Sequence, residues 1–463
     1  MAKGFQVRDP VHGFLGLCET ETKLVRARLF QRLRGIRQLA LANLVYPGAL
    51  HTRFDHSLGV CHVAQSMAEQ LGLGPDEIRL VRIAALLHDL GHGPFSHVSE
   101  NLLDRYADRE TLPLDQKKEK IHELVTGYWI LNAPDIVDIL GRDMCKQVTS
   151  LLAKGHGQPA LHSIVSGPLD ADKQDYLLRD SMFCGVEYGV FDIHQLHRSL
   201  LLYGPDEDQQ LMIASDGVHA VEQYVLAKYY LTTSVYRHRV RLITDQMIVR
   251  ALILGIEEDD LADLRRIYSF NNSAEFFDQY ATWDDAKLLL SFGASAKPDT
   301  LCGKMLDWLQ ARQLHKLVYS ERIRDFAEVK VKNLLLEVSK KSRDAFRKEL
   351  EVAIAGIIKG QCLGDVDPRL VIVHGFDIKS VRTSSRNDEG SIMVACSPKP
   401  QPFEEESPLF SSINERYAEG SVEVYAPIVW ETRSERRRAR EALRQPIKEA
   451  IEAIAKTHLP GGA

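Results

Sequence analysis

Hydrophobic residues recur at helical spacing through most of the first 255 residues. Between residues 23 and 39, apolar side chains fall near the helical period of about 3.6 residues while arginines occupy the other face, which predicts an amphipathic helix. The apolar positions there are Leu24, Val25, Leu29, Leu33 and Ile36. The same spacing returns in residues 57–72, 78–90, 168–184 and 218–253. The charged stretch 104–120, which contains Pro113, interrupts it and predicts a surface loop.

The pattern changes toward the C-terminus. A further helical stretch is predicted near 318–358. Three short apolar segments then alternate with turn-rich sequence such as SSRNDEG, which predicts strands at 370–376, 391–396 and 421–428. Residues 435–456 predict a last helix. We therefore expect a mainly α protein with a helical catalytic core over residues 1–255, followed over 256–463 by a helical extension and a small α+β lobe.

The composition indicates a cytoplasmic protein that is neither exported nor bound to a membrane. At 463 residues the chain can bury a sizeable core, and it shows no apolar signal segment and no run of about eighteen apolar residues. Seven cysteines, never spaced C-x-x-C, indicate reduced thiols rather than disulfides or a zinc ribbon. A formal net charge of -6 provides no overall field for polyanions, so a phosphate must be held by a few local cations.

The densest chemical signal is the segment ALLHDLGHGPFSH at residues 85–97. An apolar helix there ends on His88 and Asp89 and runs into a glycine-proline loop that carries His92 and His97. Imidazole and carboxylate ligands suit divalent metals such as Fe, Mn, Zn, Co or Ni, and an adjacent His and Asp at a helix end can both reach one ion. The alternative is a helix C-terminus at which the helix dipole favours histidine.

Two distant segments add polar residues of the same kind. Upstream, HTRFDHSLGV starts a predicted helix and contributes His51, Arg53, Asp55 and His56. Downstream, PLDADKQDYLLRD contributes four polar residues that share a helix face at i, i+4, i+7 and i+8: Asp172, Tyr176, Arg179 and Asp180. Such a face is usually the solvated side of a helix. Here Leu177 and Leu178 occupy the other side, and the combination with the upstream histidines favours a site.

Taken in order, these motifs resemble the HD-domain deoxynucleoside triphosphate triphosphohydrolases, most closely the catalytic core of the sterile-alpha-motif-and-HD enzymes. The resemblance covers nearly the whole chain, more loosely in the strand-rich tail, and we expect no sterile alpha motif ahead of it. The matching segments are DPVHG at 9–13, FQRLRGIRQL at 30–39, YPGALHTRFDHSLGV at 46–60, residues 85–97, IHE at 121–123, the Asp172 segment and SVYRHRV at 234–240. The resemblance implies an HD-domain fold for the helical core.

The resemblance further implies a single divalent metal ion, for which Fe, Mn, Mg, Zn, Co and Ni are all candidates. Its ligands would be His56, His88, Asp89 and Asp172. The residues beside the α-phosphate would be His92, His97 and His122, of which His97 would protonate the leaving 5′-oxygen. The cations that neutralise the phosphates would be Arg53, Lys173 and Lys228.

The sugar pocket follows from the same resemblance. Gln38 and Asp180 would hydrogen-bond the 3′-hydroxyl, and Tyr176 would line the pocket. Leu39 and Tyr236 would crowd the 2′ position and exclude ribonucleotides. The implied reaction is metal-assisted hydrolysis of a deoxynucleoside triphosphate (dNTP) at the α-phosphorus, which yields a deoxynucleoside and inorganic triphosphate.

Two other functions stay open. An HD-domain phosphodiesterase or phosphatase that acts on cyclic or monophosphate nucleotides would share the metal ligands, but it would not need the clamp of Arg53, Lys173 and Lys228. A module that binds a nucleotide or nucleic acid without turnover is the third interpretation. The complete ligand set speaks against it, because degenerate sensors usually lose a ligand.

The resemblance also implies a nucleotide effector and a homo-oligomer, with a tetramer as one form. Gln31 and Arg34 match the family's activating guanine-nucleotide site, but Arg26 stands where an acid is expected and Arg8 where an asparagine is expected. A guanidinium cannot accept the hydrogen bonds that a carboxylate accepts. Activation by another anion, or by none, is therefore open.

The arginine-rich run RSERRRAR at 433–440 suggests binding to single-stranded nucleic acid as a further alternative. Glu431, Glu435 and Glu441 are interleaved with this run. We therefore favour a helix that is laced by salt bridges, and the nucleic-acid interpretation stays open.

Overall fold

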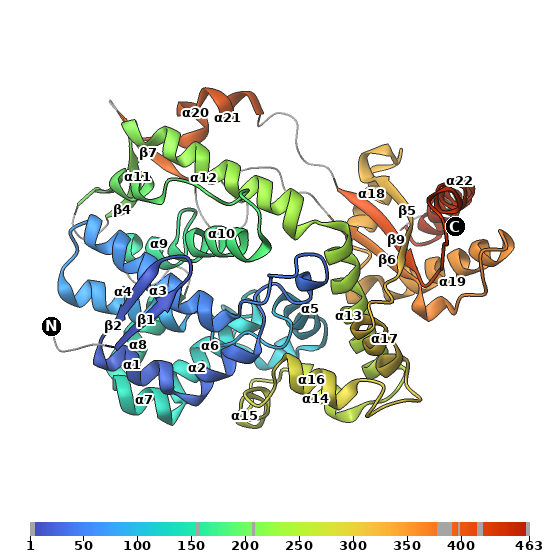
Figure 1. Cartoon of the computed structure of the whole chain (residues 1–463), viewed down its shortest axis with the longest axis horizontal. Coiled ribbons are helices and arrows are strands. Elements are labelled where there is room, and N and C mark those ends of the chain that lie inside the picture. The colour runs from blue at the N-terminus through green and yellow to red at the C-terminus, as the bar shows by residue number, and fades with distance from the viewer. Residues whose placement is uncertain are drawn as a thin grey trace. The chain divides into compact units, whose positions relative to one another are not determined.

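The computed structural model describes residues 5–153, 158–205, 209–376, 391–396, 399–413 and 420–459. Over these residues the chain is mainly α-helical with small sheets, which confirms the predicted fold class (Figure 1). Within the described part of the chain, no helix combines the length and the apolar character that crossing a membrane requires.

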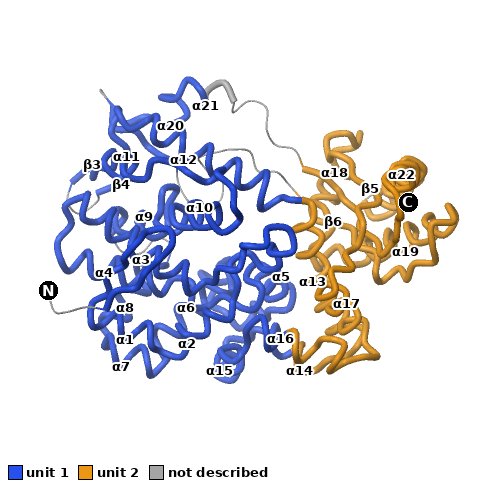
Figure 2. Tube along the Cα trace, viewed as in Figure 1, with its two compact units in different colours: residues 1–238, 266–288, 381–415 blue, residues 239–265, 289–380, 416–463 orange. Residues whose placement is uncertain are grey.

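The chain divides into two compact units that alternate along the sequence (Figure 2). Unit 1 comprises residues 1–238, 266–288 and 381–415, and unit 2 comprises residues 239–265, 289–380 and 416–463. The division therefore runs differently from a single boundary at residue 255. Hydrophobic spacing cannot show this difference, because a segment is equally amphipathic whichever unit it joins.

Three helices of unit 1 carry the motifs singled out above: α3 (Arg53–Gln70), α4 (Pro75–Leu87) and α10 (Ala171–Cys184). Helix α3 packs against both α4 and α10. It is buried along most of its length, which explains why its apolar residues are not confined to one stripe. The predicted helices at 57–72, 78–90 and 168–184 are confirmed, with ends that shift by a few residues.

Two long predicted helices are interrupted. The stretch 23–39 forms α1 (Glu19–Arg26), α2 (Arg28–Arg32) and a 3-10 turn (Leu33–Gly35). Ala27 is extended between the two helices, and the backbone N–H of Arg28 donates to Asp135 Oδ2 instead of continuing the helix. The stretch 218–253 forms α12 (Val218–Leu231), a π-helical turn (Thr232–Tyr236) and α13 (Arg239–Glu257).

The described residues of unit 1 form two sheets. The first is an antiparallel hairpin of β1 (Phe5–Asp9) and β2 (Gly13–Leu17), in which Asp9 pairs with Gly13. The second has the order β3-β4-β7-β8 and consists of β3 (Leu200–Tyr203), β4 (Gln210–Ala214), β7 (Met393–Ala395) and β8 (Gln401–Pro402). Because β7 pairs in parallel with β4, the predicted strand at 391–396 belongs to unit 1 and not to a C-terminal lobe.

Unit 2 contains an antiparallel sheet of order β5-β9-β6, formed by β5 (Lys316–Arg322), β9 (Ser421–Ala426) and β6 (Ile372–Phe376). The predicted strands at 370–376 and 421–428 are confirmed. Strand β5 shows that the start of the helix predicted near 318–358 is wrong. Its β-branched and aromatic residues suit a strand, and pairing with β9 outweighs their helical spacing. Helices α18 (Val329–Leu336) and α19 (Asp344–Gly360) occupy the rest of that stretch. The predicted turn SSRNDEG lies outside the described residues.

Helix α22 (Arg433–Thr457) completes unit 2 by packing on α19 and β5. Its buried side chains are spaced about one turn apart: Ala439, Leu443, Ile447, Ile451 and Ala455. Burial of each leucine or isoleucine in such a core contributes roughly 1.5–3 kcal/mol. This packing fixes the position of the arginine-rich first half of α22.

The remaining helices are shorter. In unit 1 they include α5 (His97–Tyr106), α6 (Ile121–Asn132), α7 (Pro134–Leu140), α8 (Arg142–Leu152), α9 (Pro159–Val165), α11 (Ile193–Arg198), α15 (Ala274–Tyr280), α20 (Phe403–Glu406) and α21 (Pro408–Ile413). The others are α14 (Ala262–Tyr268), α16 (Asp285–Phe292) and α17 (Leu301–Gln310). Between α5 and α6, residues 107–120 form a 3-10 turn and irregular segments, in agreement with the predicted loop.

Candidate metal centre

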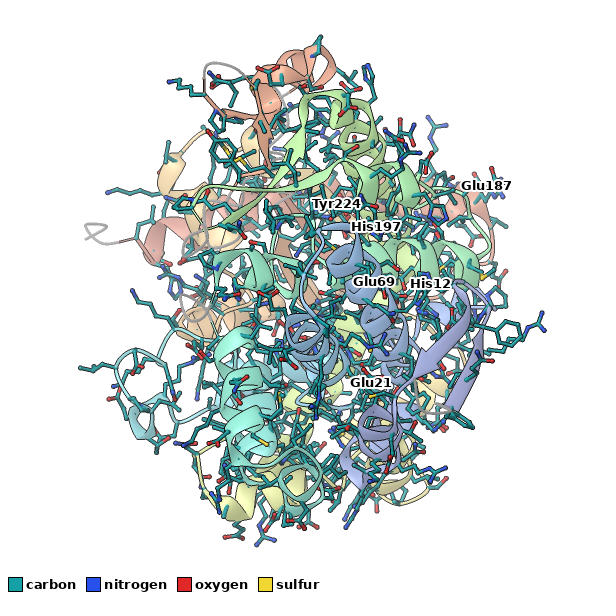
Figure 3. The ribbon with its side chains drawn as sticks, turned by 90° about the vertical axis from the view of Figure 1, so that its left-hand side faces the viewer. His12, Glu21, Glu69, Glu187, His197 and Tyr224 are labelled. Carbon is teal, nitrogen blue, oxygen red and sulfur yellow. The ribbon has the colours of Figure 1, made fainter. Side chains whose placement is uncertain are left out.

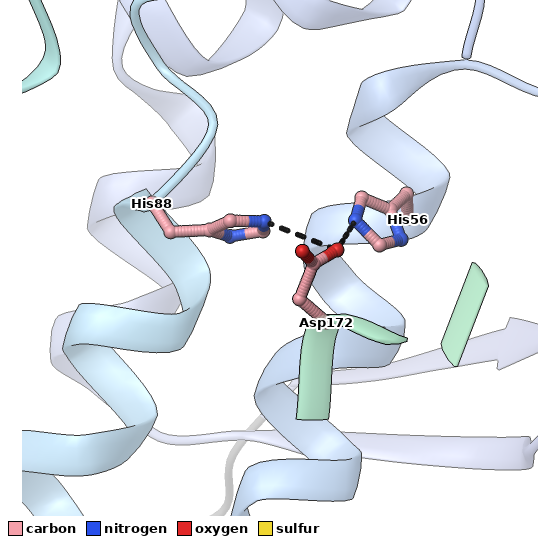
Figure 4. Close-up of side chains that lie close together, drawn as sticks. All are labelled: His56, His88 and Asp172. Atoms are coloured by element: carbon pink, nitrogen blue, oxygen red, sulfur yellow. Dashed lines mark hydrogen bonds and ion pairs between the residues drawn. The ribbon is translucent and has the colours of Figure 1, made fainter. Parts of the chain in front are cut away.

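The side chains of His56, His88 and Asp172 converge from three helices of unit 1 (Figure 4). Asp172 Oδ1 lies 2.9 Å from His56 Nε2 and 3.9 Å from His88 Nε2. Asp89 adds a carboxylate that lies 3.8 Å from His56 Nε2 and 3.2 Å from His88 Nε2. The structure therefore brings together the four residues that the sequence predicts as metal ligands.

The helix ends explain why these side chains meet. His56 lies in the first turn of α3, and His88 directly follows the last residue of α4. Asp172 lies in the first turn of α10, where Asp170 caps the helix by accepting a hydrogen bond from the backbone N–H of Lys173 at 2.7 Å. His56, His88 and Asp172 thus come from the ends of three helices.

The ring of His88 is oriented as a metal ligand requires. Its Nδ1 lies 2.7 Å from the carbonyl oxygen of Ala85, and since a carbonyl can only accept, Nδ1 carries the proton. The Nε2 atom is buried and, among the described residues, has no hydrogen-bond partner. In the neutral ring its lone pair therefore faces the carboxylates of Asp89 and Asp172, an arrangement that a cation between them would make favourable.

The buried carboxylate of Asp175 contacts the ring nitrogen of His56 that does not face Asp172. His56 Nδ1 lies 2.8 Å from Asp175 Oδ2, so the other ring nitrogen, Nε2, points toward Asp172. Burial lowers the pKa of His56, but the hydrogen bonds to Asp172 and Asp175 outweigh burial and raise that pKa to about 10. Without a metal ion, a proton on His56 therefore supplies the positive charge between the two carboxylates.

Asp175 is held in turn by polar partners from two elements. Its carboxylate accepts from Arg179 Nε at 2.8 Å and lies 2.6 Å from Nε2 of His12, which comes from the turn between β1 and β2 (Figure 3). Arg179 also donates to Asp9 Oδ2 at 2.8 Å. Although burial opposes it, Arg179 and the two histidines hold the pKa of Asp175 well below its ordinary value.

Gly59 makes room for this arrangement on α3. A Cβ at that position would overlap the Asp175 carboxylate and the guanidinium of Arg179. Neither Asp175 nor Gly59 is among the predicted site residues. The available signal in the sequence was the i+3 position of Asp175 after Asp172, which places it on the same helix face, beside Arg179 and toward His56 of α3.

The loop after Asp89 packs against two other segments of unit 1. The backbone N–H of Gly91 donates to Thr126 Oγ1 at 2.9 Å, and a Cβ at Gly91 would overlap the carbonyl oxygen of His122. The backbone N–H of Phe95 donates to Asp285 Oδ1 at 2.7 Å. Glycine is required at this close approach, and the loop is fixed where it presents its histidines.

Arg53, predicted to bind phosphate, contacts a metal ligand in this structure. Its Nη1 donates to Asp89 Oδ2 at 2.6 Å and its Nε donates to Ser96 Oγ at 2.8 Å. The side chain is buried. Arg53 therefore orients Asp89 and places a fixed positive charge at the edge of the metal centre.

Three predicted catalytic histidines gather around Glu100. Glu100 Oε1 lies 2.9 Å from His97 Nδ1, 3.1 Å from His92 Nδ1 and 3.9 Å from His122 Nδ1. The rings of His92 and His122 stack with centroids 4.2 Å apart. His92 also reaches the metal centre, because its Nε2 lies 3.2 Å from Asp89 Oδ1. The two clusters are therefore contiguous.

The exposure and charge of these histidines differ. The His97 side chain is 67% exposed, whereas His92 and His122 are buried. Burial and the neighbouring His92 hold the pKa of His122 well below its ordinary value, so this ring is neutral near pH 7. Burial opposes ionisation of Glu100, but His97 and His92 beside it hold its pKa well below the ordinary value. Glu100 is not among the predicted residues; its i+3 spacing from His97 was the available signal.

The predicted sugar-binding residues form a second group in unit 1. Asp180 accepts from the hydroxyl of Tyr236 at 2.5 Å and lies 2.8 Å from His51 Nε2. Tyr176 and Tyr236 form an edge-on pair with centroids 6.2 Å apart. The Gln38 Oε1 atom is buried without a hydrogen-bond partner among the described residues, and the adjacent Leu39 is buried. Gln38 thus offers an acceptor that a ligand hydroxyl could satisfy.

The two predicted phosphate-binding lysines are placed differently. Lys173 is buried, and its ammonium donates to Asp170 Oδ2 at 2.7 Å and to the carbonyl of Gly167 at 3.1 Å. Lys228 lies in the last turn of α12 and is half-buried. Lys173 is therefore held by a carboxylate, and a phosphate would have to compete with that ion pair.

The residues that match the family's effector site lie on α2 and the 3-10 turn that follows it. Gln31 donates from Nε2 to the carbonyl of Val25 at 2.6 Å and accepts from Arg34 Nε at 3.0 Å. Arg34 also covers the ring of Phe54. Arg26 and Arg8 are exposed, so neither supplies the carboxylate or the amide that the resemblance calls for.

Comparisons with family models support this assignment of the motifs. The HD domain model matches residues 53–156, and the model of the HD associated region matches residues 191–450. The first match contains three of the predicted ligands on α3 and at the end of α4. Asp172 lies between the two matched stretches.

Several curated proteins are similar to part of the chain. An uncharacterized protein from Methanocaldococcus jannaschii is 35% identical over 268 residues, which are 58% of this chain and 53% of that protein. The deoxynucleoside triphosphate triphosphohydrolase SAMHD1 homolog from Dictyostelium discoideum is 29% identical over 284 residues, 58% of this chain and 53% of that protein. Human deoxynucleoside triphosphate triphosphohydrolase SAMHD1 is 29% identical over 283 residues, 53% of this chain and 44% of that protein. The chain spans about half the length of these relatives.

Two solved structures share the fold. A hypothetical protein from Aquifex aeolicus has a TM-score of 0.67 at 24% identity, covering 95% of this chain and 100% of that chain. A phosphohydrolase from Bacteroides thetaiotaomicron has a TM-score of 0.69 at 22% identity, covering 91% of this chain and 99% of that chain. At this identity the likeness shows the fold alone.

The support of His56 by Asp175 can be tested by Asp175→Asn. Loss of the carboxylate should free the His56 ring and weaken binding of Mn²⁺ by about 10–100-fold, as for other partners behind a metal-bound histidine. Competition against a chelating dye measures the affinity, and circular dichroism checks the fold. The matched control is Asp138→Asn on α7, where the side chain is exposed. Unchanged Mn²⁺ affinity in Asp175→Asn would contradict this role.

Proposed function

The chain belongs to the family of HD-domain proteins with an HD-associated region, and on that basis we propose that it is a metal-dependent phosphohydrolase that cleaves dNTPs to a deoxynucleoside and inorganic triphosphate. The observation that carries the proposal is the convergence of His56, His88, Asp89 and Asp172 beside the Glu100 cluster. A metal-binding group and a proton-donating group thus lie side by side, as hydrolysis of a phosphoester requires.

The metal centre sets the position of the phosphate. When bound there, a divalent ion would supply Lewis-acid chemistry at a phosphoryl oxygen and would ease the ionisation of water. Around it, Arg53 contributes a fixed guanidinium, and the first turns of α3 and α10 contribute positive helix ends. These groups attract an anion to the ligand cluster and offset charge that develops on the phosphoryl oxygens.

His97 is the residue best placed to donate a proton to the leaving oxygen. Glu100 binds its Nδ1 at 2.9 Å, so in the protonated ring Nε2–H is left to donate outward. Departure of a 5′-alkoxide requires such a donor, because an alkoxide is a poor leaving group in water. His122 is neutral near pH 7 and stacks on His92, which suits these two rings to bind substrate oxygens rather than to carry the transferred proton.

The sugar preference is proposed from the second cluster. Asp180 and Gln38 provide acceptors, and Tyr236 and Tyr176 provide aromatic walls, which together fit a deoxyribose with a free 3′-hydroxyl. The support for a dNTP in particular comes from the relatives named as deoxynucleoside triphosphate triphosphohydrolases, at 29% identity or less over about half of their length.

A second candidate is a phosphohydrolase for nucleotides with fewer phosphates. The observation that favours it is the engagement of Lys173 with Asp170 and of Arg53 with Asp89, which leaves these cations already partnered by carboxylates. A triphosphate clamp requires at least one of these ion pairs to open on binding. A monophosphate or cyclic nucleotide would need only the metal centre and the Glu100 cluster.

Product analysis separates these candidates. With Mn²⁺ or Mg²⁺, each of the four dNTPs should yield deoxynucleoside and inorganic triphosphate in equal amounts, measured by chromatography of both products. Release of pyrophosphate with a monophosphate, or of phosphate with a diphosphate, would overturn the triphosphohydrolase proposal. Turnover of monophosphates or cyclic nucleotides, with dNTPs left intact, would establish the second candidate.

The role of His97 predicts a defined loss of rate. His97→Ala should lower kcat by about 10²–10⁴-fold, the usual contribution of a general acid, with a smaller effect on KM. The chain offers a matched control in His219, which is 87% exposed and pairs with Glu222 at i+3 as His97 pairs with Glu100. His219→Ala should retain full activity. A His97→Ala variant with wild-type kcat would show that another group donates the proton.

A further inference from the structure

A groove in unit 2 is lined by an unusual concentration of arginines. It has a volume of about 710 Å³ and lies between β5 and the first half of α22. Its charged lining residues are Arg433, Arg436, Arg437, Arg440, Arg444 and Glu441. All of them belong to unit 2, and none is a residue of the metal centre or of the predicted effector site.

Most of these arginines are not neutralised within the protein. Arg444 forms an ion pair with Glu321 at 3.1 Å. Among the described residues, the guanidinium groups of the other four form no ion pair or hydrogen bond. Glu435, which we expected to form salt bridges along this helix, instead accepts from the backbone N–H groups of Glu431 and Thr432 and caps α22. The expected salt-bridged helix is therefore wrong over this stretch.

The arginines are close enough to disfavour one another's charge. Burial and the nearby Arg239, Arg440 and Arg433 lower the pKa of Arg436. Burial and Arg239 likewise lower the pKa of Arg440, with Glu423 as the opposing carboxylate. Glu423 is one carboxylate beside these arginines, and the hydroxyls of Tyr425 and Ser320 also donate to it. The groove therefore holds a surplus of positive charge that an anion would relieve.

One of the residues that line the groove carries a further unsatisfied donor. Tyr319 on β5 lines the groove and is 1% exposed, and its hydroxyl has no hydrogen-bond partner among the described residues. A buried hydroxyl without a partner is costly, so such groups are usually bound by water or by a ligand. This observation is independent of the arginine charges and points to the same place.

We propose that this groove binds a small polyphosphate, either inorganic triphosphate or the phosphate chain of a nucleotide. Guanidinium groups bind phosphate oxygens through two parallel hydrogen bonds, which makes arginine the favoured residue for this chemistry. From Arg433 to Arg444 the row extends about 16 Å along the helix axis, at about 1.5 Å per residue. It can therefore engage several phosphates in line rather than one.

The lining favours a free polyphosphate over single-stranded nucleic acid. Proteins that bind single strands combine basic grooves with exposed aromatic side chains on which bases stack. The aromatic residue that lines this groove is Tyr319, and it is buried. The groove binds phosphates, and its described lining offers no exposed aromatic side chain on which a base could stack, so the base of a nucleotide would extend into solvent.

Titration calorimetry on the full chain tests the proposal. The probes are inorganic triphosphate, ATP and a single-stranded oligodeoxynucleotide. A chelator is present to keep divalent metal from the catalytic centre. Wild-type protein should bind inorganic triphosphate at this groove. Arg436→Gln/Arg440→Gln should lose one equivalent of binding, or weaken it by at least about tenfold. The matched control is Arg438→Gln, an exposed arginine of the same helix that does not line the groove.

These binding outcomes do not depend on whether the chain hydrolyses dNTPs. Thermal unfolding without anion checks that the double variant folds, and relief of repulsion should leave its Tm unchanged or higher. Equal triphosphate binding by wild type and the double variant, or no binding by wild type, would overturn the proposal. An oligodeoxynucleotide that binds more than about tenfold tighter than triphosphate, and loses affinity in the double variant, would replace it with a nucleic-acid site. The test measures anion binding and requires no catalytic turnover.

Discussion

In the catalytic unit, two imidazole rings and two carboxylates are brought so close together that they require a cation. His88 donates its only proton from the neutral ring to the Ala85 carbonyl, so its Nε2 faces Asp89 and Asp172 and has no hydrogen-bond partner in the described part of the chain. The ring of His56 is likewise oriented by a contact at its Nδ1, here with the Asp175 carboxylate. In a buried site, unpaired charges and lone pairs of this kind are expensive, and the cost is removed by a bound metal ion or, at His56, by a proton.

The rest of unit 1 is organised to hold that arrangement. Asp175 is fixed by Arg179 and by His12, and Arg179 is fixed by Asp9, so the β1–β2 hairpin at the start of the chain supports a ligand on α3. Gly59 leaves the space in which these groups meet. On the opposite side, Asp89 links the metal centre to Arg53 and to His92, and through Glu100 to the exposed His97. Metal binding and proton donation therefore share one network.

The site residues that could be predicted from the sequence are those that lie in recognisable local motifs. His88 and Asp89 stand together at a helix end, and His56 and Asp172 stand in recognisable motifs, so these four residues could be predicted and the structure brings them together. Asp175 and Glu100 could not, because each lies at an i+3 position whose meaning depends on which helix packs opposite. The helix predicted where β5 forms, and the assignment of the predicted strand β7 to the C-terminal lobe, were wrong for a similar reason: the partner strands β9 and β4 lie about a hundred or more residues away. The alternation of the two units along the chain likewise leaves no local pattern.

The central claim is that one divalent ion binds between His56, His88, Asp89 and Asp172. Anomalous X-ray diffraction from crystals grown with Mn²⁺ tests it most directly. The account predicts one strong anomalous peak within coordination distance, about 2.0–2.2 Å, of two imidazole nitrogens and the two carboxylates. A crystal with no peak there, or with its peak among His92, Glu100 and His122 instead, which is the other described group able to hold a metal ion, would contradict it.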